Sequence, residues 1–138
     1  YGEGKDLECL KELVNFYMLN SRVHFHGHVN NVESIWKNNH ILILPSLAEG
    51  TPLALIEAMV CGRPSIVSDV GGNTELIEDG ISGFVVSNSS VKQLDLALEN
   101  AWQQKGSWGQ MGFEARKAVL EKIDFESYKL IYNNAIKN

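Results

Sequence analysis

The sequence predicts an α/β fold built on a parallel sheet. Short apolar segments of strand length alternate along the chain with longer segments in which apolar residues recur every three or four positions, as on one face of a helix. One strand candidate, Ile41 to Leu44, is apolar at every position and is followed by Pro45, a pattern typical of a strand that is covered on both faces. Because parallel strands are joined by right-handed helical crossovers, we expect a doubly wound, Rossmann-like sheet.

The first third of the chain predicts a helix, a strand and a short helix. The first helix spans 5–19, and it should bury a stripe formed by Leu7, Leu10, Leu13, Val14, Tyr17 and Met18. A strand over 22–26 follows. The second helix spans 30–38, where Asn30 and Glu33 have the spacing of a capping box.

The middle third contains the strand at 41–44 and a helix that follows it. This helix should span 52–61, with Thr51 as its N-cap, Pro52 at its first position and Gly62 at its end. The remaining elements are, in order, a strand at 65–68, a turn at Gly71-Gly72, a helix over 73–78, a turn at Asp79-Gly80 and a strand at 83–86.

The last third predicts three helices. The first begins at a second capping box, Ser90 and Gln93, and should bury Val91, Leu94, Ala97, Leu98, Ala101 and Trp102. The other two helices span 109–121 and 125–136. The final helix carries an apolar stripe that we expect to face a partner; it consists of Phe125, Tyr128, Ile131, Tyr132, Ala135 and Ile136. The three tryptophans, Trp36, Trp102 and Trp108, are predicted at the core or at a domain edge.

The length of 138 residues fits one domain. Four strands are few for a doubly wound sheet, and the helix at 5–19 has no strand in front of it. The chain also opens at Tyr1-Gly2-Glu3-Gly4, without an initiator methionine. We therefore expect residues 1–138 to be a single domain from which an N-terminal part is absent.

Composition excludes several classes of protein. Hydrophobic residues make up 44% and charged residues 21% of the chain, as in a soluble globular protein, and no apolar run is long enough for a bilayer. The net charge is −5 and no basic cluster exceeds two adjacent residues, which argues against a nucleic-acid surface. Cys9 and Cys61 lie far apart, in no zinc or redox spacing, and are expected to be free thiols in a reducing cytoplasm.

The segment 45–59 carries the clearest chemical signal. It runs from a strand through a loop into a helix, and ligands of open α/β sheets bind beyond the carboxyl ends of the strands. The helix start near Thr51 leaves backbone N–H groups without acceptors and adds partial positive charge, which suits a phosphate. Gly50, which has no Cβ, lets a ligand approach the backbone closely.

Two carboxylates flank this predicted anion site. Glu49 precedes the helix and Glu57 lies eight positions later, in its second turn. A carboxylate can accept hydrogen bonds from two neighbouring hydroxyls, so the pair matches a molecule with hydroxyls on both sides of a phosphate, as in a nucleotide sugar. Taken singly, Glu49 could merely compensate the helix dipole and Glu57 could lie on a solvated face. The apolar neighbours of Glu57 favour a carboxylate that needs a partner.

This segment resembles the E-x7-E motif of the retaining GT-B glycosyltransferases called group 1. The matching context comprises Pro45-Ser46, Glu49-Gly50, Pro52-Leu53, Glu57-Ala58-Met59, Gly62-Arg63-Pro64, Gly71-Gly72, Glu75, Asp79-Gly80 and Gly83. The resemblance is densest over 41–86 and looser over the whole chain. It implies the second, C-terminal domain of a GT-B enzyme, which binds the nucleotide-sugar donor.

The resemblance also implies roles for individual residues. Glu49 would be the catalytic residue that binds hydroxyls of the transferred sugar, and Glu57 would bind the ribose hydroxyls. Backbone amides at Gly50, Thr51 and Leu53 would hold the sugar and the diphosphate, since Pro52 has no N–H. Thr51 departs from the family, in which a phenylalanine is common there.

Residues outside this segment are implied as well. The stretch Val23 to Val29 resembles the family's strand and glycine loop against the base, which makes His28 and Val29 candidate base contacts. Gly2 and Gly4 resemble a glycine turn near the nucleotide. The Arg and Lys that neutralise the diphosphate in the family have no counterpart in this chain.

Two motifs leave alternatives open. His24, His26 and His28 alternate, so their rings could share one side of a strand and hold a metal, but no carboxylate or cysteine is adjacent, and we expect no metal. The stretch from Gly71-Gly72 to Glu75 could be a second phosphate site or an ordinary tight turn, and the resemblance places Gly72 at the cleft.

We therefore expect the donor-binding domain of a cytoplasmic, retaining hexosyltransferase in polysaccharide biosynthesis. Its donor would be a UDP or GDP sugar, with no cofactor and no nucleic-acid partner. The acceptor domain would belong to the same chain and be absent here, as would any peripheral membrane contact made through it, and the fragment alone should be inactive. The alternatives are a nucleotide-sugar epimerase or sugar phosphorylase of GT-B fold, and a non-catalytic doubly wound binding domain, which would not need both glutamates.

Overall fold

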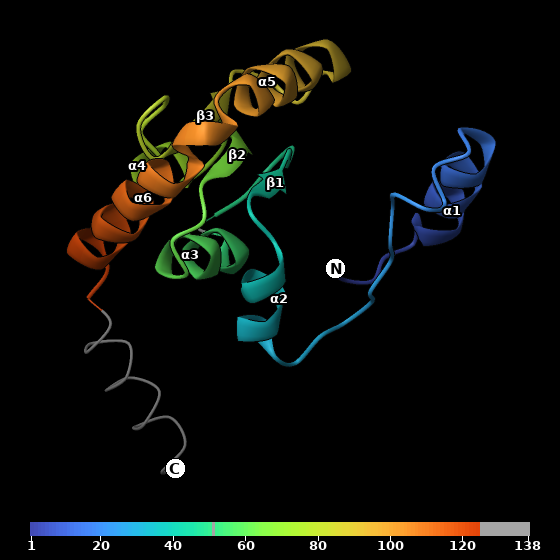
Figure 1. Cartoon of the computed structure of the whole chain (residues 1–138), viewed down its shortest axis with the longest axis horizontal. Coiled ribbons are helices and arrows are strands. Elements are labelled where there is room, and N and C mark those ends of the chain that lie inside the picture. The colour runs from blue at the N-terminus through green and yellow to red at the C-terminus, as the bar shows by residue number, and fades with distance from the viewer. Residues whose placement is uncertain (51, 125–138) are drawn as a thin grey trace. The chain divides into compact units, whose positions relative to one another are not determined.

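The computed structural model describes residues 1–50 and 52–124 (Figure 1). These residues form two compact units, one ending at Ile35 and one beginning at Trp36. The elements in chain order are α1 (Leu7–Phe16), α2 (Val32–Asn38), β1 (Leu42–Leu44), α3 (Leu53–Val60), β2 (Ser65–Ser68), α4 (Asn73–Leu76), β3 (Gly83–Val86), α5 (Val91–Gln103), a short 3₁₀ helix at Lys105–Ser107 and α6 (Trp108–Lys122).

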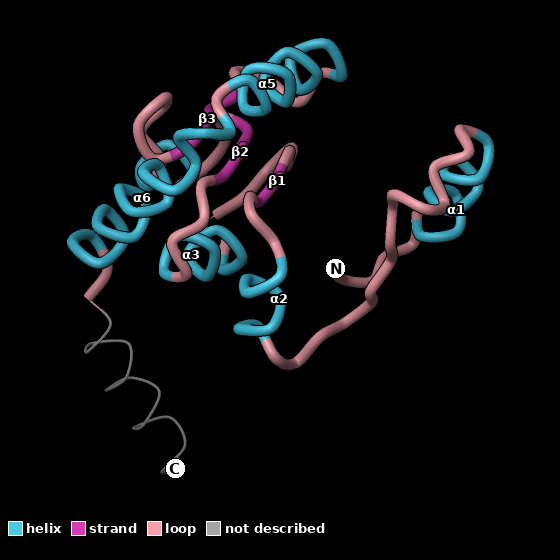
Figure 2. Tube along the Cα trace, in the orientation of Figure 1, coloured by secondary structure: helices cyan, strands magenta, loops and turns pink. Residues whose placement is uncertain are grey.

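The second unit contains a three-stranded parallel sheet in the order β1-β2-β3 (Figure 2). In its register Ile43 pairs with Ile66, and Ile66 pairs with Phe84. The central strand β2 is buried at all four positions. The prediction of a parallel sheet is confirmed, and β2 and β3 have the predicted bounds.

Helices cover both faces of this sheet, as predicted for a doubly wound fold. On one face, Val67 of β2 packs with Leu55 and Met59 of α3 and with Val119 of α6. On the other face lies a second buried cluster, formed by Ile66, Phe84, Val86, Ala101 and Met111. Neighbouring strand residues point to opposite faces, so Ile66 and Val67 belong to different clusters.

The chain reverses sharply where the sequence predicted it. Gly62 follows α3 with a φ of +66°, and Gly80 has a φ of +76° in the Asp79-Gly80 turn. A left-handed residue after a helix is usually glycine, because other side chains are strained there. Cys9 and Cys61 are free and exposed, as expected.

The first unit differs from the prediction in its secondary structure. Residues 23–29 form no strand, so the predicted strand at 22–26 is wrong. A strand exists only if a neighbouring strand takes its backbone hydrogen bonds, and the described residues of this unit offer none. A candidate built from side-chain pattern alone cannot reveal this.

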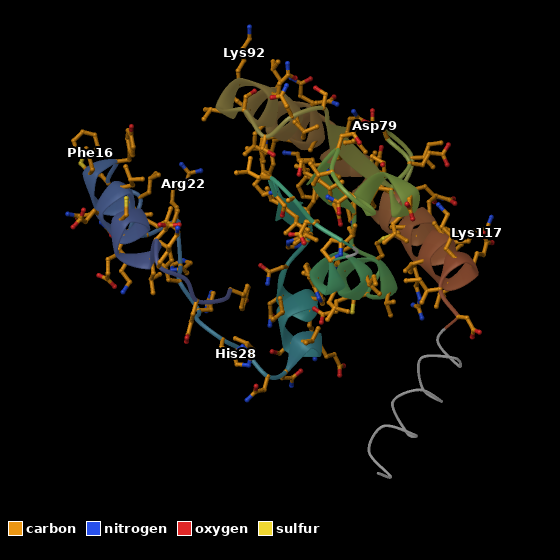
Figure 3. All side chains as sticks on the ribbon, turned by 180° about the vertical axis from the view of Figure 1, so that it is seen from behind. Phe16, Arg22, His28, Asp79, Lys92 and Lys117 are labelled. Atoms are coloured by element: carbon orange, nitrogen blue, oxygen red, sulfur yellow. The ribbon has the colours of Figure 1, made fainter. Side chains whose placement is uncertain are left out.

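The helix α1 is shorter and more exposed than the sequence suggested. It has no buried residue, so the predicted burial of its apolar stripe is wrong. Phe16, at its C-terminal end, is 75% exposed (Figure 3). Tyr17 and Met18 lie beyond the helix, and Met18 adopts a left-handed φ of +54°. The stripe follows helical spacing, but this small unit places no second layer over it.

Several predicted helix starts shift by a residue. Asn31, and not Asn30, accepts the Ser34 N–H at 3.0 Å at the start of α2. Pro52 is the N-cap of α3 and not its first helical residue, with an extended ψ of 124°. At α5 the Ser90 hydroxyl accepts the Gln93 N–H, as predicted, but the Ser90 N–H donates to Asn88 instead of completing the box. The helix predicted at 73–78 ends at Leu76.

Burial at the sheet edge and on α5 is also lower than predicted. Ile43 of β1 is 45% exposed, because β1 lies at the edge of the described sheet and α5 packs on β2 and β3. On α5, Ala101 is buried and Leu94 and Ala97 are half-buried, whereas Val91, Leu98 and Trp102 flank the contact and are exposed. The fourth predicted strand is absent from the described sheet.

The three tryptophans and the last predicted helix have separate outcomes. Trp36 is buried, Trp108 is half-buried, and Trp102 packs edge-to-face on Trp108 with Lys105 above its ring. The helix predicted at 125–136 lies outside the described residues. No helix in residues 1–50 or 52–124 is long and apolar enough to cross a membrane.

Candidate functional site

The carboxyl ends of all three strands meet at one residue, Ser46. The Ser68 hydroxyl, at the end of β2, donates to the Ser46 carbonyl at 2.5 Å. The Ser89 hydroxyl, just past β3, donates to the same carbonyl at 2.8 Å. Ser46 itself follows β1 by two residues. Since ligands of open α/β sheets bind beyond this edge, the cluster marks the region where a site is expected.

Glu49 lies in the loop between β1 and α3. Its Oε1 accepts a hydrogen bond from the Ser46 hydroxyl at 2.6 Å, and the residue is half-buried. A carboxylate has a second oxygen and further lone pairs, so this contact leaves acceptors for another group. The structure thus holds Glu49 by one oxygen at the end of the sheet.

The start of α3 has backbone donors that find no acceptor within the helix. Pro52 caps the helix without a side-chain hydrogen bond, and it has no N–H of its own. The N–H groups of Leu53 and Ala54, the first two helical residues, have no acceptor within the helix. Leu53 is 74% exposed. Gly50 is exposed too, while Thr51 lies outside the described residues.

Glu57 lies one turn further along α3. It is half-buried, on the same helix as the fully buried Leu55, Ala58 and Met59. In the described part of the chain, no side chain forms a hydrogen bond or an ion pair with its carboxylate. A half-buried carboxylate without a partner among the described residues is available to bind a ligand.

The Gly71-Gly72 turn packs directly against the loop that carries Glu49. Gly71 has a φ of +55°, and a Cβ added there would lie 1.8 Å from the Glu49 carbonyl oxygen. The Gly72 N–H donates to the Gly50 carbonyl at 2.8 Å. This amide is therefore used within the protein, and the turn supports the Glu49-Gly50 segment.

The first unit gathers the other predicted nucleotide contacts. The Gly2 N–H donates to the Gly27 carbonyl at 2.6 Å, which places Gly2 beside the turn that leads to His28 and Val29. Gly2 and Gly27 both have a left-handed φ, +106° and +62°. The His28 ring lies 2.9 Å from the Asn30 side-chain oxygen, on the extended segment before α2 (Figure 3).

The two other histidines of this segment have different surroundings. The His24 and His26 ring centroids are 6.3 Å apart, and His26 stacks on Tyr1 at 4.6 Å. Across the described residues no group of three His, Cys, Asp or Glu side chains is arranged to hold a metal ion. Gly4 has open space around it.

Each unit brings some of the predicted residues together. The second unit holds Glu49, Gly50, Leu53, Glu57 and Gly72 around the β1–α3 loop, and the first unit holds Gly2 near His28. Sequence reasoning missed the three serines at the strand ends, Ser46, Ser68 and Ser89. The available signal was a serine at or just past the end of three of the four predicted strands, those at 41–44, 65–68 and 83–86.

Comparison with known proteins gives a consistent result. The sequence model of the family described as "Glycosyl transferases group 1" matches residues 1–118. The UDP-Gal:alpha-D-GlcNAc-diphosphoundecaprenol alpha-1,3-galactosyltransferase of Escherichia coli is 33% identical over 105 residues, which make up 75% of this chain and 27% of that protein.

Two solved structures have a similar fold. Sucrose-phosphate synthase from Thermosynechococcus elongatus superposes with a TM-score of 0.83 at 24% identity, over 99% of this chain and 35% of that one. Anabaena HepE in complex with UDP-glucose gives a TM-score of 0.82 at 20% identity, over 99% of this chain and 38% of that one. The chain thus spans between about a quarter and two-fifths of the length of these proteins.

Proposed function

We propose, because the chain belongs to the group 1 glycosyl transferases, that it is the donor-binding domain of an enzyme that transfers a sugar from a nucleotide diphosphate sugar with retention of configuration. The observation that carries this proposal is the start of α3, which has no side-chain cap hydrogen bond, with Glu49 held before it and Glu57 behind it without a partner among residues 1–50 and 52–124. The GT-B epimerase, the phosphorylase and the non-catalytic domain have no observation of their own in their favour.

In this proposal the donor spans the β1–α3 loop. The diphosphate lies at the α3 start, where the N–H groups of Gly50, Leu53 and Ala54 and the helix dipole oppose its charge. Glu57 accepts hydrogen bonds from the ribose hydroxyls, and the free oxygen of Glu49 accepts them from the sugar. Within the first unit, His28 and Val29 are proposed base contacts, and Gly2 and Gly4 are proposed nucleotide contacts. Gly72 acts by supporting the loop through its hydrogen bond to Gly50.

The chemistry that follows is electrostatic. Departure of the nucleoside diphosphate builds negative charge on the phosphates, and amides already fixed in place stabilise that charge without reorganising. Glu49 orients the sugar so that its anomeric carbon faces the acceptor. No residue in this scheme needs to be a metal ligand.

The donor is proposed to be a UDP sugar. The name of the Escherichia coli relative specifies UDP-Gal as its substrate, and the Anabaena protein of similar fold was solved with UDP-glucose. UDP-glucose is therefore the first probe for this chain, with GDP and ADP sugars as comparisons.

Replacing Glu57 by glutamine should weaken UDP binding by tenfold or more. The amide loses the charge that strengthens hydrogen bonds to the ribose, and such bonds contribute about 1.5–3 kcal/mol. Isothermal titration of both proteins measures the change. Glu121→Gln, on the exposed side of α6, is the matched control and should bind UDP as the wild type does. Equal affinity of Glu57→Gln and the wild type, with the fold intact, would remove Glu57 from the site.

Residues 1–138 alone should transfer no sugar, although they bind donor. They span about a third of the length of similar proteins, and transfer requires donor and acceptor to be held together in a reactive geometry. The assay follows UDP release from UDP-glucose with and without candidate acceptors. Acceptor-dependent release that disappears in Glu49→Ala would show that the whole active site lies within this chain.

A further inference from the structure

At this sheet edge, Ser46 forms hydrogen bonds through both its backbone carbonyl and its side-chain hydroxyl. Its carbonyl accepts two hydroxyls, one from Ser68 at 2.5 Å and one from Ser89 at 2.8 Å. Its own hydroxyl donates to Glu49 at 2.6 Å. The residue therefore links the ends of β2 and β3 to one particular carboxylate oxygen.

The two serines that hold the Ser46 carbonyl are themselves buried or half-buried. Ser68 is 1% exposed and belongs to the central strand, which is buried throughout. Ser89 comes from the segment after β3 and is half-buried. The two hydroxyls hold the Ser46 carbonyl at the end of the sheet. From this backbone the Ser46 hydroxyl donates to Glu49.

The contact with Glu49 is not a helix cap, although its spacing is that of one. The pattern Ser-x-x-Glu usually indicates a capping box, in which the two side chains bond to backbone N–H groups at a helix start. No helix begins at Ser46, since the next one starts at Leu53. Here the two side chains form a hydrogen bond with each other, in which the Ser46 hydroxyl donates to Oε1 of Glu49.

We propose that Ser46 is a positioning residue for Glu49 and thereby sets the preference of the site for a nucleotide sugar over the bare nucleotide. The proposal rests on the role of Glu49 in the proposed function. With Oε1 bound to Ser46, the other carboxylate oxygen points in one direction and meets the sugar hydroxyls there. Without the hydroxyl, the Glu49 side chain, which has three rotatable bonds, samples several rotamers. Sugar binding must then restrict this side chain to one rotamer, and the lost entropy weakens the affinity for the sugar.

The test compares Ser46→Ala, Ser46→Thr and wild type by isothermal titration with UDP and with UDP-glucose. Ser46→Ala should weaken UDP-glucose binding about fivefold and change UDP binding less than about twofold, the size of one lost orienting hydrogen bond. Ser46→Thr keeps the hydroxyl and should retain the wild-type preference for UDP-glucose over UDP. Ser87→Ala, on the exposed loop after β3, is the matched control and should change neither affinity.

A second arm separates positioning from a general effect on the fold. In a Glu49→Ala background, Ser46→Ala should have no further effect on UDP-glucose affinity, because the carboxylate through which Ser46 is proposed to act is absent. Ser89→Ala removes one of the two anchors and should lower the UDP-glucose preference in the same direction, by a smaller factor. Urea unfolding checks that each variant is folded, and Ser89→Ala keeps the test open if Ser46→Ala does not fold.

The outcomes are distinct for the two proposals. Equal weakening of UDP and UDP-glucose by Ser46→Ala, or an undiminished effect in the Glu49→Ala background, would overturn the positioning role. If wild type binds no nucleotide sugar, the proposed function fails. In that case NMR relaxation of the Glu49 side chain still decides the geometry, because it should be ordered in wild type and mobile in Ser46→Ala. Equal order in both proteins would overturn the positioning role whatever the chain binds.

Discussion

Gly71→Ala should weaken UDP-glucose binding by roughly 10- to 100-fold while leaving the protein folded, since misplacing a binding group by about 1 Å can produce losses of that size. The added Cβ would lie 1.8 Å from the Glu49 carbonyl oxygen and 2.9 Å from that of Gly50. Both atoms belong to the backbone, so a rotamer change cannot relieve the overlap and the loop must shift. The shift displaces Glu49 and the N–H groups before α3 together.

A matched control for this prediction is Gly80→Ala. Gly80 also has a left-handed φ, +76°, but nothing lies within 4 Å of an added Cβ. Both variants therefore carry backbone strain of about 1–3 kcal/mol, and only Gly71→Ala displaces the loop. Titration with UDP-glucose and urea unfolding on both variants separate strain from displacement. Equal UDP-glucose affinities for the two variants would contradict the supporting role of the Gly71-Gly72 turn.

Gly112→Ala should destabilise the protein by about 2 kcal/mol, although alanine is the better helix former. Gly112 lies in α6, and its added Cβ would be 2.0 Å from the Gly62 carbonyl oxygen, just after α3. Overpacking of this kind costs about 1–3 kcal/mol, and the value should fall at the upper end because the clashing atom is backbone. Helix propensity returns only about 1 kcal/mol. The steric overlap therefore outweighs the gain in helix propensity, and the free energy of unfolding should fall.

The same helix supplies the control for this second prediction. Gly109 is also in α6, yet nothing lies within 4 Å of a Cβ added there. Gly109→Ala should stabilise the protein by about 0.5–1 kcal/mol, through helix propensity alone. Urea denaturation of the two variants measures the difference. A Gly112→Ala protein as stable as Gly109→Ala would show that α3 and α6 do not pack as closely as described.

Local signals predicted the second unit well. The strands at 65–68 and 83–86 have the predicted bounds, and Pro64 and Gly83 mark where they begin. The start of α3 was predicted to within one residue, and the placement of Glu49 before it followed from one proline and one apolar helix pattern. These features depend on neighbouring residues, which a sequence displays directly.

Features that depend on distant partners were not predictable. The segment 22–26 has a strand-like pattern, but a strand requires a neighbour that this unit does not provide among the described residues. The hydrogen bonds that anchor Ser46 join residues 22 and 43 positions apart. The pair Ser46 and Glu49 has the spacing of a helix cap, so its sequence pattern points to a different structure from the one observed.

The most direct test of the central claim is NMR mapping of UDP-glucose on this chain. At 15.4 kDa the backbone amides can be followed individually during a titration. We predict saturable shifts that are largest at Gly50, Leu53 and Ala54 and extend along α3 to Glu57, with a smaller response to UDP alone around Glu49. A titration in which these amides stay unchanged while others shift, or in which no amide shifts, would contradict the assignment of the donor site to the β1–α3 loop.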